Sequence, residues 1–324
     1  MTTHERELTA PVDLCTPDGL RLNPAARGWS RRPLHRANLD GCVGRNKRWD
    51  YWAVLAGDVV MSAVYANVDY LGLADVWWAN LATGESGGHG IVSDAAGFVL
   101  PEVSGTSPLH IDEKGLALDI SDDSEGTSIV ARWPEGLLDM RVARPPAHDS
   151  LNVVIPWSDE LFNYTSKHQA RPAEGMLNGV TFVDAWGVLD VGRGRWPAQI
   201  TWNWGGGAGC SGDHVVGIQI GAKWTVGSGF TENGIIVDGV LSKIGAELDW
   251  DYDWDAPMKP WRVSDPNRQL DIVLTPRFDK FTDGPGGGTH QVFGTWAGRV
   301  VTDEGLALEF DALQGFAEEA RQDW

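Results

Sequence analysis

Short runs of alternating apolar and polar residues recur along the chain, and they constrain the fold more than any other sequence feature. Alternation with a period of two puts the apolar side chains on one face of a strand, whereas an amphipathic helix needs a period near 3.6. Glycines, which favour turns and bulges, make up 40 of the 324 residues. The clearest runs are Val59–Val68, Gly115–Ile120, Leu137–Val142, Leu151–Ile155, His214–Trp224 and Leu270–Leu274. This pattern predicts an all-β protein built from barrels or sandwiches.

Helical periodicity is confined to the C-terminus. The apolar residues there recur at intervals of three and four, which places them on one helical face. They are Leu313, Phe316, Ala317, Ala320 and Trp324. We therefore expect one short helix over Leu313–Trp324.

The length and one internal repeat suggest two domains. A chain of 324 residues is about twice the size of an ordinary domain. Asp112–Ile120 resembles Asp303–Phe310, because each is an acidic turn followed by Gly-Leu-Ala-Leu. We expect two similar β-domains over residues 15–160 and 161–324, with the boundary near the polar stretch Trp157–Gln169.

Charge and cysteine content exclude several classes of function. The net charge of −19 argues against binding to nucleic acid or to anionic membranes. The three cysteines have no short spacing and indicate neither a disulfide framework nor a zinc site. Residues 1–13 lack the apolar segment of a signal peptide, and no apolar run reaches 18 residues. We expect a cytoplasmic protein without a membrane span, and the sequence leaves its oligomeric state open.

Two motifs that resemble ligand sites lack the context they need. Gly207–Gly212 matches the glycine pattern of dinucleotide-binding loops, but a strand is expected after it where the pyrophosphate needs a helix. We interpret this segment as a loop between two strands. Asp249–Asp255 begins like a calcium loop but has Trp254 and Pro260 where an EF-hand needs Gly and Glu. Its alternation favours a strand with a solvated acidic face, and a cation site is the alternative.

No metal or cofactor is expected. The eight histidines are scattered, without His-Glu-x-x-His or His-x-His spacing. The sequence also lacks the Gly-Lys-Ser/Thr end of a phosphate-binding loop and the Gly-x-Ser-x-Gly motif of serine hydrolases.

The stretch Trp196–Trp204 is the strongest candidate for a ligand-binding wall. Alternation places Trp196, Trp202 and Trp204 on one face and Asn203 on the other. A core strand with inward-packed indole rings explains this pattern equally well. The alternative is that the rings line a pocket, a role that large aromatic side chains often take.

Several polar residues lie in aromatic or glycine-rich segments. Burial there would shift their pKa values into a range that suits proton transfer. For each residue alone, a structural hydrogen bond is the competing explanation. The candidates for catalysis are Tyr164, Lys167, Asp190 and Glu232. The candidates for substrate binding, besides the three tryptophans and Asn203, are His168, Arg193 and Asn233.

Three groups of segments resemble the bacterial family catalogued as domain of unknown function 2804. They are Gly28–Leu34 with Lys47–Trp52, then Asn152–Ser158 with Tyr164–Lys167, then Gly194–Trp204 with Lys223–Thr225 and Thr231–Gly234. The resemblance covers nearly the whole chain but implies no assigned activity.

A more distant likeness involves Tyr164–Lys167, the glycines that follow, and Trp186 to Trp204. These segments are similar to the tandem lipocalin-like proteins, which include carotenoid hydratases and Diels–Alderase-type cyclases. The likeness implies two lipocalin-like (calycin-type) barrels with a ligand pocket in or between them. It identifies no catalytic residue in this chain.

Three functions fit these observations. The first is a cofactor-independent enzyme of lyase or isomerase type, such as a hydratase, cyclase or isomerase, that acts on a hydrophobic metabolite. The second is a non-enzymatic lipid- or isoprenoid-binding protein. The third is a carbohydrate-active enzyme that uses a carboxylate pair such as Asp190 and Glu232.

Overall fold

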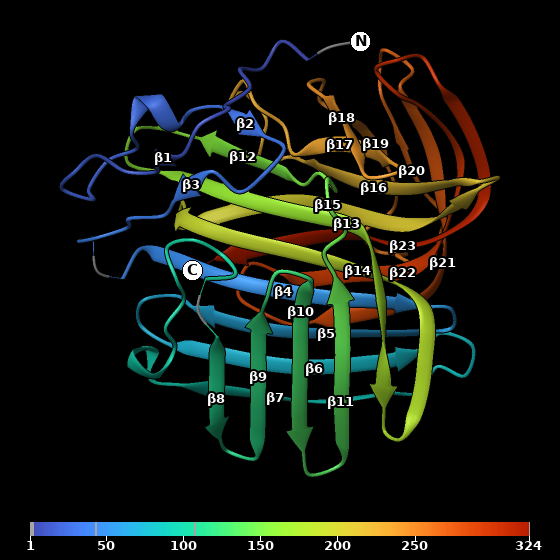
Figure 1. Ribbon diagram of the computed structural model, residues 1–324, viewed down its shortest axis with the longest axis horizontal. Helices are drawn as coiled ribbons and strands as arrows, with labels where there is room; N and C mark the ends of the chain where they lie inside the picture. The colour runs from blue at the N-terminus through green and yellow to red at the C-terminus, as the bar shows by residue number, and fades with distance from the viewer. Residues whose placement is uncertain (1–2, 43, 107, 324) are drawn as a thin grey trace.

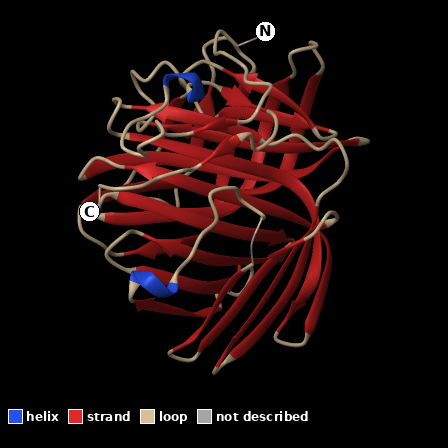
Figure 2. Cartoon of the chain, turned by 60° about the vertical axis from the view of Figure 1, so that its left-hand side comes forward, coloured by secondary structure: helices blue, strands red, loops and turns tan. Residues whose placement is uncertain are grey.

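The computed structural model describes residues 3–42, 44–106 and 108–323. Strands dominate this part of the chain, and its helical content is two short 3-10 turns, Pro24–Ala26 and Ala95–Gly97 (Figure 2). The all-β prediction is confirmed. None of the helices described is both long and apolar enough to cross a membrane.

Within the described residues, the larger sheet has 12 strands and folds over on itself. In Figure 1, β8–β11 run across the direction of β4–β7. The strands follow the order β7 (Ser86–Ser93), β6 (Gly72–Asn80), β5 (Val59–Asn67), β4 (Asn46–Ala56), β14 (Val180–Arg195), β13 (Phe162–Leu177), β11 (Gly136–Ala143), β10 (Gly126–Trp133), β9 (Leu116–Asp122) and β8 (Leu109–Glu113). β12 (Leu151–Pro156) pairs with β13 and with β2 (Trp29–Ser30).

In the described part of the chain the second sheet has nine strands, which also surround a core. Their order is β18 (Val240–Ile244), β17 (Asn233–Val237), β16 (His214–Ala222), β15 (Gln199–Ser211), β23 (Ala307–Asp323), β22 (Gly288–Val301), β21 (Leu270–Thr282), β20 (Trp261–Ser264) and β19 (Asp249–Asp251). A small parallel pair, β1 (Val12–Asp13) and β3 (His35–Arg36), lies outside both sheets.

Each sheet encloses its own hydrophobic core, and a further apolar cluster joins them. Trp52 lies in the core of the larger sheet, and Trp261 and Trp296 lie in the core of the second. Leu55 of the larger sheet belongs to the same cluster as Phe316 of the second, so the outward-facing sides of the two sheets pack together.

The predicted C-terminal helix is wrong, because residues 307–323 form β23. Leu313 and Ala317 face the core of the second sheet, whereas Phe316 packs toward the larger sheet. Burial on both faces of one strand produces apolar spacings of three and four, which imitate a helix. Trp324, the last residue of the prediction, lies outside the described residues.

The glycine-rich motif is part of a strand, not the expected loop. Gly207 and Gly209 lie in β15, and β16 follows after a turn. A Cβ on Gly207 would lie 2.7 Å from the carbonyl oxygen of Gln314, so glycine lets β23 pack closely here. The acidic motif also differs from its prediction. Only Asp249–Asp251 is a strand, and Asp253 forms an ion pair with Lys259.

The chain passes from the larger to the second sheet between Arg195 and Gln199. The boundary predicted at residues 160/161 lies between β12 and β13, which are paired within the larger sheet. The division into two similar β-domains over residues 15–160 and 161–324 stays a prediction.

We predict that Gly192→Ala destabilises the protein by about 1–3 kcal/mol, the usual cost of overpacking. A Cβ on Gly192 would lie 1.9 Å from the indole ring of Trp49, so the ring would have to move. Urea unfolding measures the change. Gly97→Ala is the control, since a Cβ there meets nothing within 4 Å. Equal stability of the two variants would contradict this account of Gly192.

Candidate functional site

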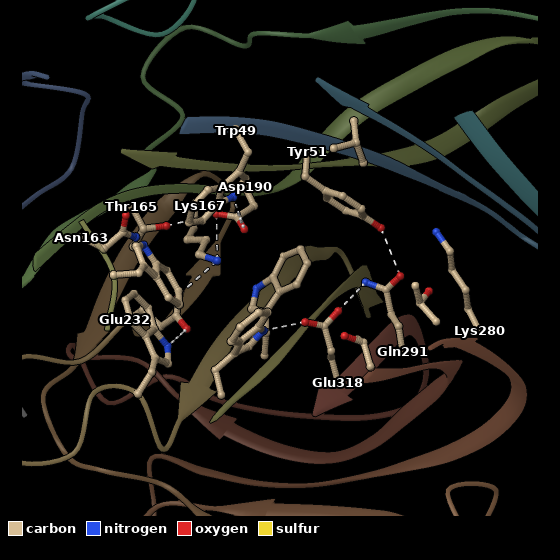
Figure 3. Close-up of a pocket in the computed structure, with 17 residues that line it drawn as sticks. Trp49, Tyr51, Asn163, Thr165, Lys167, Asp190, Glu232, Lys280, Gln291 and Glu318 are labelled. Carbon is tan, nitrogen blue, oxygen red and sulfur yellow. Dashed lines mark hydrogen bonds and ion pairs between the residues drawn. The ribbon is translucent and has the colours of Figure 1, made fainter. Parts of the chain in front are cut away.

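A cavity of about 290 Å³ lies where the outward-facing sides of the two sheets meet (Figure 3). The larger sheet contributes strands β4, β5, β13 and β14, and the second contributes β15, β21, β22 and β23. Segments flanking β15–β17 supply the remaining side chains. The lining residues are Trp49, Tyr51, Val64, Asn163, Thr165, Lys167, Asp190, Trp196, Trp202, Trp204, Trp224, Glu232, Lys280, Thr282, Thr289, Gln291 and Glu318.

Strand alternation brings the polar residues of the larger sheet to the cavity. Thr165 and Lys167 lie two residues apart on β13 and therefore share a face. Lys167 is the cross-strand partner of Asp190 on β14, and Asp190 is the partner of Tyr51 on β4. Directly opposed residues project to the same side of a sheet. Three adjacent strands thus present their side chains to one space.

Glycines provide the room that these side chains occupy. Gly192 lies opposite Trp49 on the neighbouring strand, and the indole ring covers it. In the second sheet, Gly221 leaves room for the side chain of Glu232, because a Cβ on Gly221 would lie 2.0 Å from Oε1 of Glu232. A larger residue at either position would displace a side chain that lines the cavity.

Lys167 lies at the centre of the first polar group. Its Nζ is 2.9 Å from Oδ1 of Asp190 and 3.2 Å from Oε2 of Glu232. Asp190 also accepts hydrogen bonds from Trp49 Nε1 and Thr165 Oγ1. All three charged side chains are almost completely buried. Two carboxyl groups therefore share one ammonium group.

These neighbours change the protonation of the group. Burial raises the pKa of Glu232 to about 7, although the Lys167 ammonium opposes the shift. Trp224 Nε1 donates a 2.7 Å hydrogen bond to Oε1 of Glu232. Burial alone would lower the pKa of Lys167, but the attraction of Asp190 and Glu232 outweighs it and raises that pKa. Lys167 therefore stays charged at neutral pH, while Glu232 can gain or lose a proton.

Glu318 is the centre of a second polar group. Its carboxyl accepts hydrogen bonds from Trp202 Nε1 at 2.7 Å and from Gln291 Nε2 at 3.0 Å. Tyr51 in turn donates to Oε1 of Gln291 at 3.3 Å. Burial raises the pKa of Glu318 to about 7, against the opposing effects of Trp202 and Lys167. In Figure 3 this group and the Lys167 group lie on opposite sides of the cavity.

Indole rings form much of the remaining wall. Trp196 stacks on Trp224 with ring centroids 5.5 Å apart, and Trp202 meets Trp196 edge to face at the same separation. The Lys167 Nζ lies 4.4 Å from the ring centroid of Trp204, a cation–π contact. The cavity thus combines rigid apolar walls with two buried acid–base groups.

The structure brings six predicted site residues to this cavity. They are the catalytic candidates Lys167, Asp190 and Glu232 and the binding candidates Trp196, Trp202 and Trp204. Trp202 and Trp204 lie on one face of β15, as their parity indicates, while Trp196 precedes that strand.

The other five candidates do not line the cavity. Tyr164 is on the opposite face of β13, where its hydroxyl donates to Asn152 Oδ1 at 3.2 Å. His168 shares that face and lies 3.1 Å from Ser166 Oγ.

Arg193 is held in a buried ion pair with Asp50 at 2.6 Å. Asn203 points away from Trp202 and donates to the hydroxyl of Tyr252. Asn233 accepts a hydrogen bond from the backbone of Gly221. Each of these three residues has a structural partner.

Glu318, Gln291, Tyr51 and Lys280 are among the cavity residues that were not predicted from the sequence. The helix expected at the C-terminus concealed Glu318, whereas a period of two would have placed it on the same face as Phe316. Tyr51 belongs to the segment Lys47–Trp52 that carries the family resemblance, which was an available signal. Gln291 and Lys280 have no local sequence signal, because only strand pairing in the second sheet brings them to the cavity.

We predict that Glu318→Gln becomes more stable relative to the unmodified protein as pH rises. The pKa of Glu318 is raised from 4.5 to about 7, so the folded state binds more protons between these values. The stabilisation from this group is therefore present below pH 4.5 and is lost as pH rises through 7. The difference in unfolding free energy should grow by about 2–3 kcal/mol between pH 5 and pH 8.

Urea unfolding at the two pH values measures this difference. Glu304→Gln provides the matched control, because it makes the same substitution at an exposed position. A constant difference for Glu318→Gln would show that this carboxyl is already ionised at pH 5.

Comparison with known proteins identifies the fold and the family. Kievitone hydratase from Nectria haematococca superposes with a TM-score of 0.50 at 10% identity, covering 86% of this chain and 89% of that one. CghA in complex with Sch210972 superposes with a TM-score of 0.44 at 13% identity, covering 88% and 91% of the two chains.

At such low identity the similarity to the hydratase shows only that the two proteins share a fold. That fold consists of two lipocalin-like units. No curated protein sequence matches the chain. Residues 5–324 match the family described as "Domain of unknown function (DUF2804)", and the chain therefore belongs to that family.

Proposed function

We propose that this protein is a cofactor-independent acid–base enzyme that adds water to, cyclises or isomerises a hydrophobic small molecule. The observation that carries the proposal is the pair Glu232 and Glu318, two buried carboxyl groups in one cavity whose pKa values are raised to about 7. A general acid or base works best when its pKa is near the working pH. At neutral pH each of these groups exists in both forms.

The two carboxyl groups can play complementary roles. In a hydration, the protonated group donates its proton to one carbon of a substrate double bond. The ionised group removes a proton from water, whose oxygen bonds to the other carbon. In a cyclisation or isomerisation, one group donates a proton to the substrate and the other removes one. Atoms and charge balance in each case, and the two carboxyl groups exchange protonation states.

Lys167 has an electrostatic and positioning role in this proposal. Its raised pKa keeps it charged, so it is a poor proton donor at neutral pH. Its ammonium orients Asp190 and Glu232 and stabilises negative charge that develops on a substrate beside it. The indole walls hold the substrate, and a cavity of about 290 Å³ is near the lower end of ordinary ligand pockets. A small, compact substrate fits best.

The buried acid–base groups favour an enzyme over a lipid- or isoprenoid-binding protein. A binding protein has no need of carboxyl groups held at a raised pKa, since burying them is costly. The shared fold with a protein named as a hydratase agrees with this choice but does not carry it.

A carbohydrate-active enzyme based on Asp190 and Glu232 is less well supported. A glycosidase needs open space for the glycosidic bond between its two carboxyl groups. Here both carboxyl groups contact the same nitrogen of Lys167, so the ammonium stands between them.

Incubation with the apolar metabolites of the host organism tests the proposal. We expect one compound to disappear and a product to form that is either heavier by one water molecule or equal in mass. In deuterated water the product should carry deuterium wherever its new C–H bond comes from the acid. Glu232→Gln and Glu318→Gln should each slow turnover by about 10²–10⁴, the range of general acid–base catalysis. Mass spectrometry of the extract measures both effects.

Exposed Glu304→Gln is the control and should react at the unmodified rate. The rate should peak near pH 7, because one carboxyl group must be protonated and the other ionised. A compound that binds without chemical change, in the unmodified protein and in both variants, would refute the proposal in favour of a binding protein.

A further inference from the structure

Asn163 is a fully buried polar residue that lines the cavity without a hydrogen-bonding partner. Its exposed fraction is 0%, and within the described residues neither Nδ2 nor Oδ1 has a partner. Buried amide groups are nearly always paired, because losing water without a replacement partner is costly. An unpaired donor and acceptor at a cavity wall therefore point to a ligand.

The local structure holds this amide at the Lys167 side of the cavity. Asn163, Thr165 and Lys167 alternate along one face of β13, and Figure 3 shows Asn163 beside Thr165. Its cross-strand partner is Gly194, and a Cβ there would lie 2.7 Å from Oδ1 of Asn163. Glycine at this position leaves space for the amide.

Asn152 on the neighbouring strand shows what a structural asparagine looks like here. It is equally buried, but its Nδ2 donates to the carbonyl oxygen of Ser30 at 3.0 Å and its Oδ1 accepts from Tyr164. Asn152 thus stabilises the fold through both ends of its amide. The side-chain amide of Asn163, on the cavity side, neither donates nor accepts a hydrogen bond within the described residues.

We propose that Asn163 is a specificity-determining residue that binds a hydroxyl group on an otherwise apolar substrate. A hydroxyl group both donates and accepts, so it pairs with Oδ1 and Nδ2 together, whereas a ketone or ether oxygen leaves Oδ1 unpaired. The inference rests on the proposed function, because it concerns the same cavity. Asn163 and Lys167 are four residues apart on one strand, about 13 Å along its axis. A hydroxyl held at Asn163 therefore directs the rest of the molecule past Asp190 and Lys167.

The pair 2-naphthol and naphthalene tests this, since the two compounds differ by one hydroxyl group. Isothermal titration calorimetry should show that the unmodified protein binds 2-naphthol at least tenfold more tightly. Asn163→Leu, which keeps the side-chain size, should reduce that preference to less than threefold and leave naphthalene affinity within threefold. Val64→Phe, which fills part of the cavity, should weaken the binding of both compounds.

Thermal unfolding without ligand provides a readout that a structural role would not give. Asn163→Leu should raise the Tm, since it removes an unpaired buried amide, whereas the control Asn152→Leu should lower it. A 2-naphthol preference that survives Asn163→Leu, or a Tm lowered by that change, would overturn this inference and leave the acid–base proposal standing. If neither compound binds, or if Val64→Phe leaves their binding unchanged, the cavity is not the ligand site. Either outcome would overturn both proposals.

Discussion

A positive charge buried between the two sheets is the constraint on which the site depends. An isolated ammonium group in this position would be strongly destabilising, and Lys167 is tolerated because two carboxyl groups contact it. Asp190 belongs to the larger sheet, whereas Glu232 precedes β17 of the second, so the contact spans their junction. Glu232 and Glu318 line the same cavity, and burial of their carboxyl groups raises both of their pKa values.

Small and large residues together produce a cavity where a filled core would otherwise form. Gly192 and Gly221 have no side chain, so the side chains of Trp49 and Glu232 occupy the space beside them. Neighbouring indole rings brace one another, as in the stacked pair Trp196 and Trp224. Rings held in this way cannot collapse into the remaining space, so the cavity keeps its shape. Preorganised walls and oriented polar groups reduce the reorganisation that a reaction would otherwise require.

The two sides of the cavity carry different polar groups, which can orient a bound molecule. Asn163 and the Lys167 group lie on one side, and Glu318 with Gln291 lies on the other (Figure 3). Apolar walls alone would allow a compact hydrophobic molecule to bind in many orientations. A single polar anchor selects among them, and binding energy away from the reacting atoms can then serve to position those atoms. Fold similarity says nothing about such details, which depend on side chains that differ among proteins 10% identical.

The sequence by itself determined the all-β class, because a period of two is a local property that strand geometry imposes. It also placed Trp202 and Trp204 on one face, and aromatic and glycine-rich context singled out Lys167, Asp190 and Glu232. It failed at β23, where burial on both faces imitated a helical period and hid Glu318. Only the tertiary structure decided which strand faces meet: Tyr164 and Lys167 are three residues apart but face opposite sides of β13, while Lys167 and Glu232 are 65 residues apart and in contact. Strand pairing and sheet packing are long-range, so no local pattern can specify them.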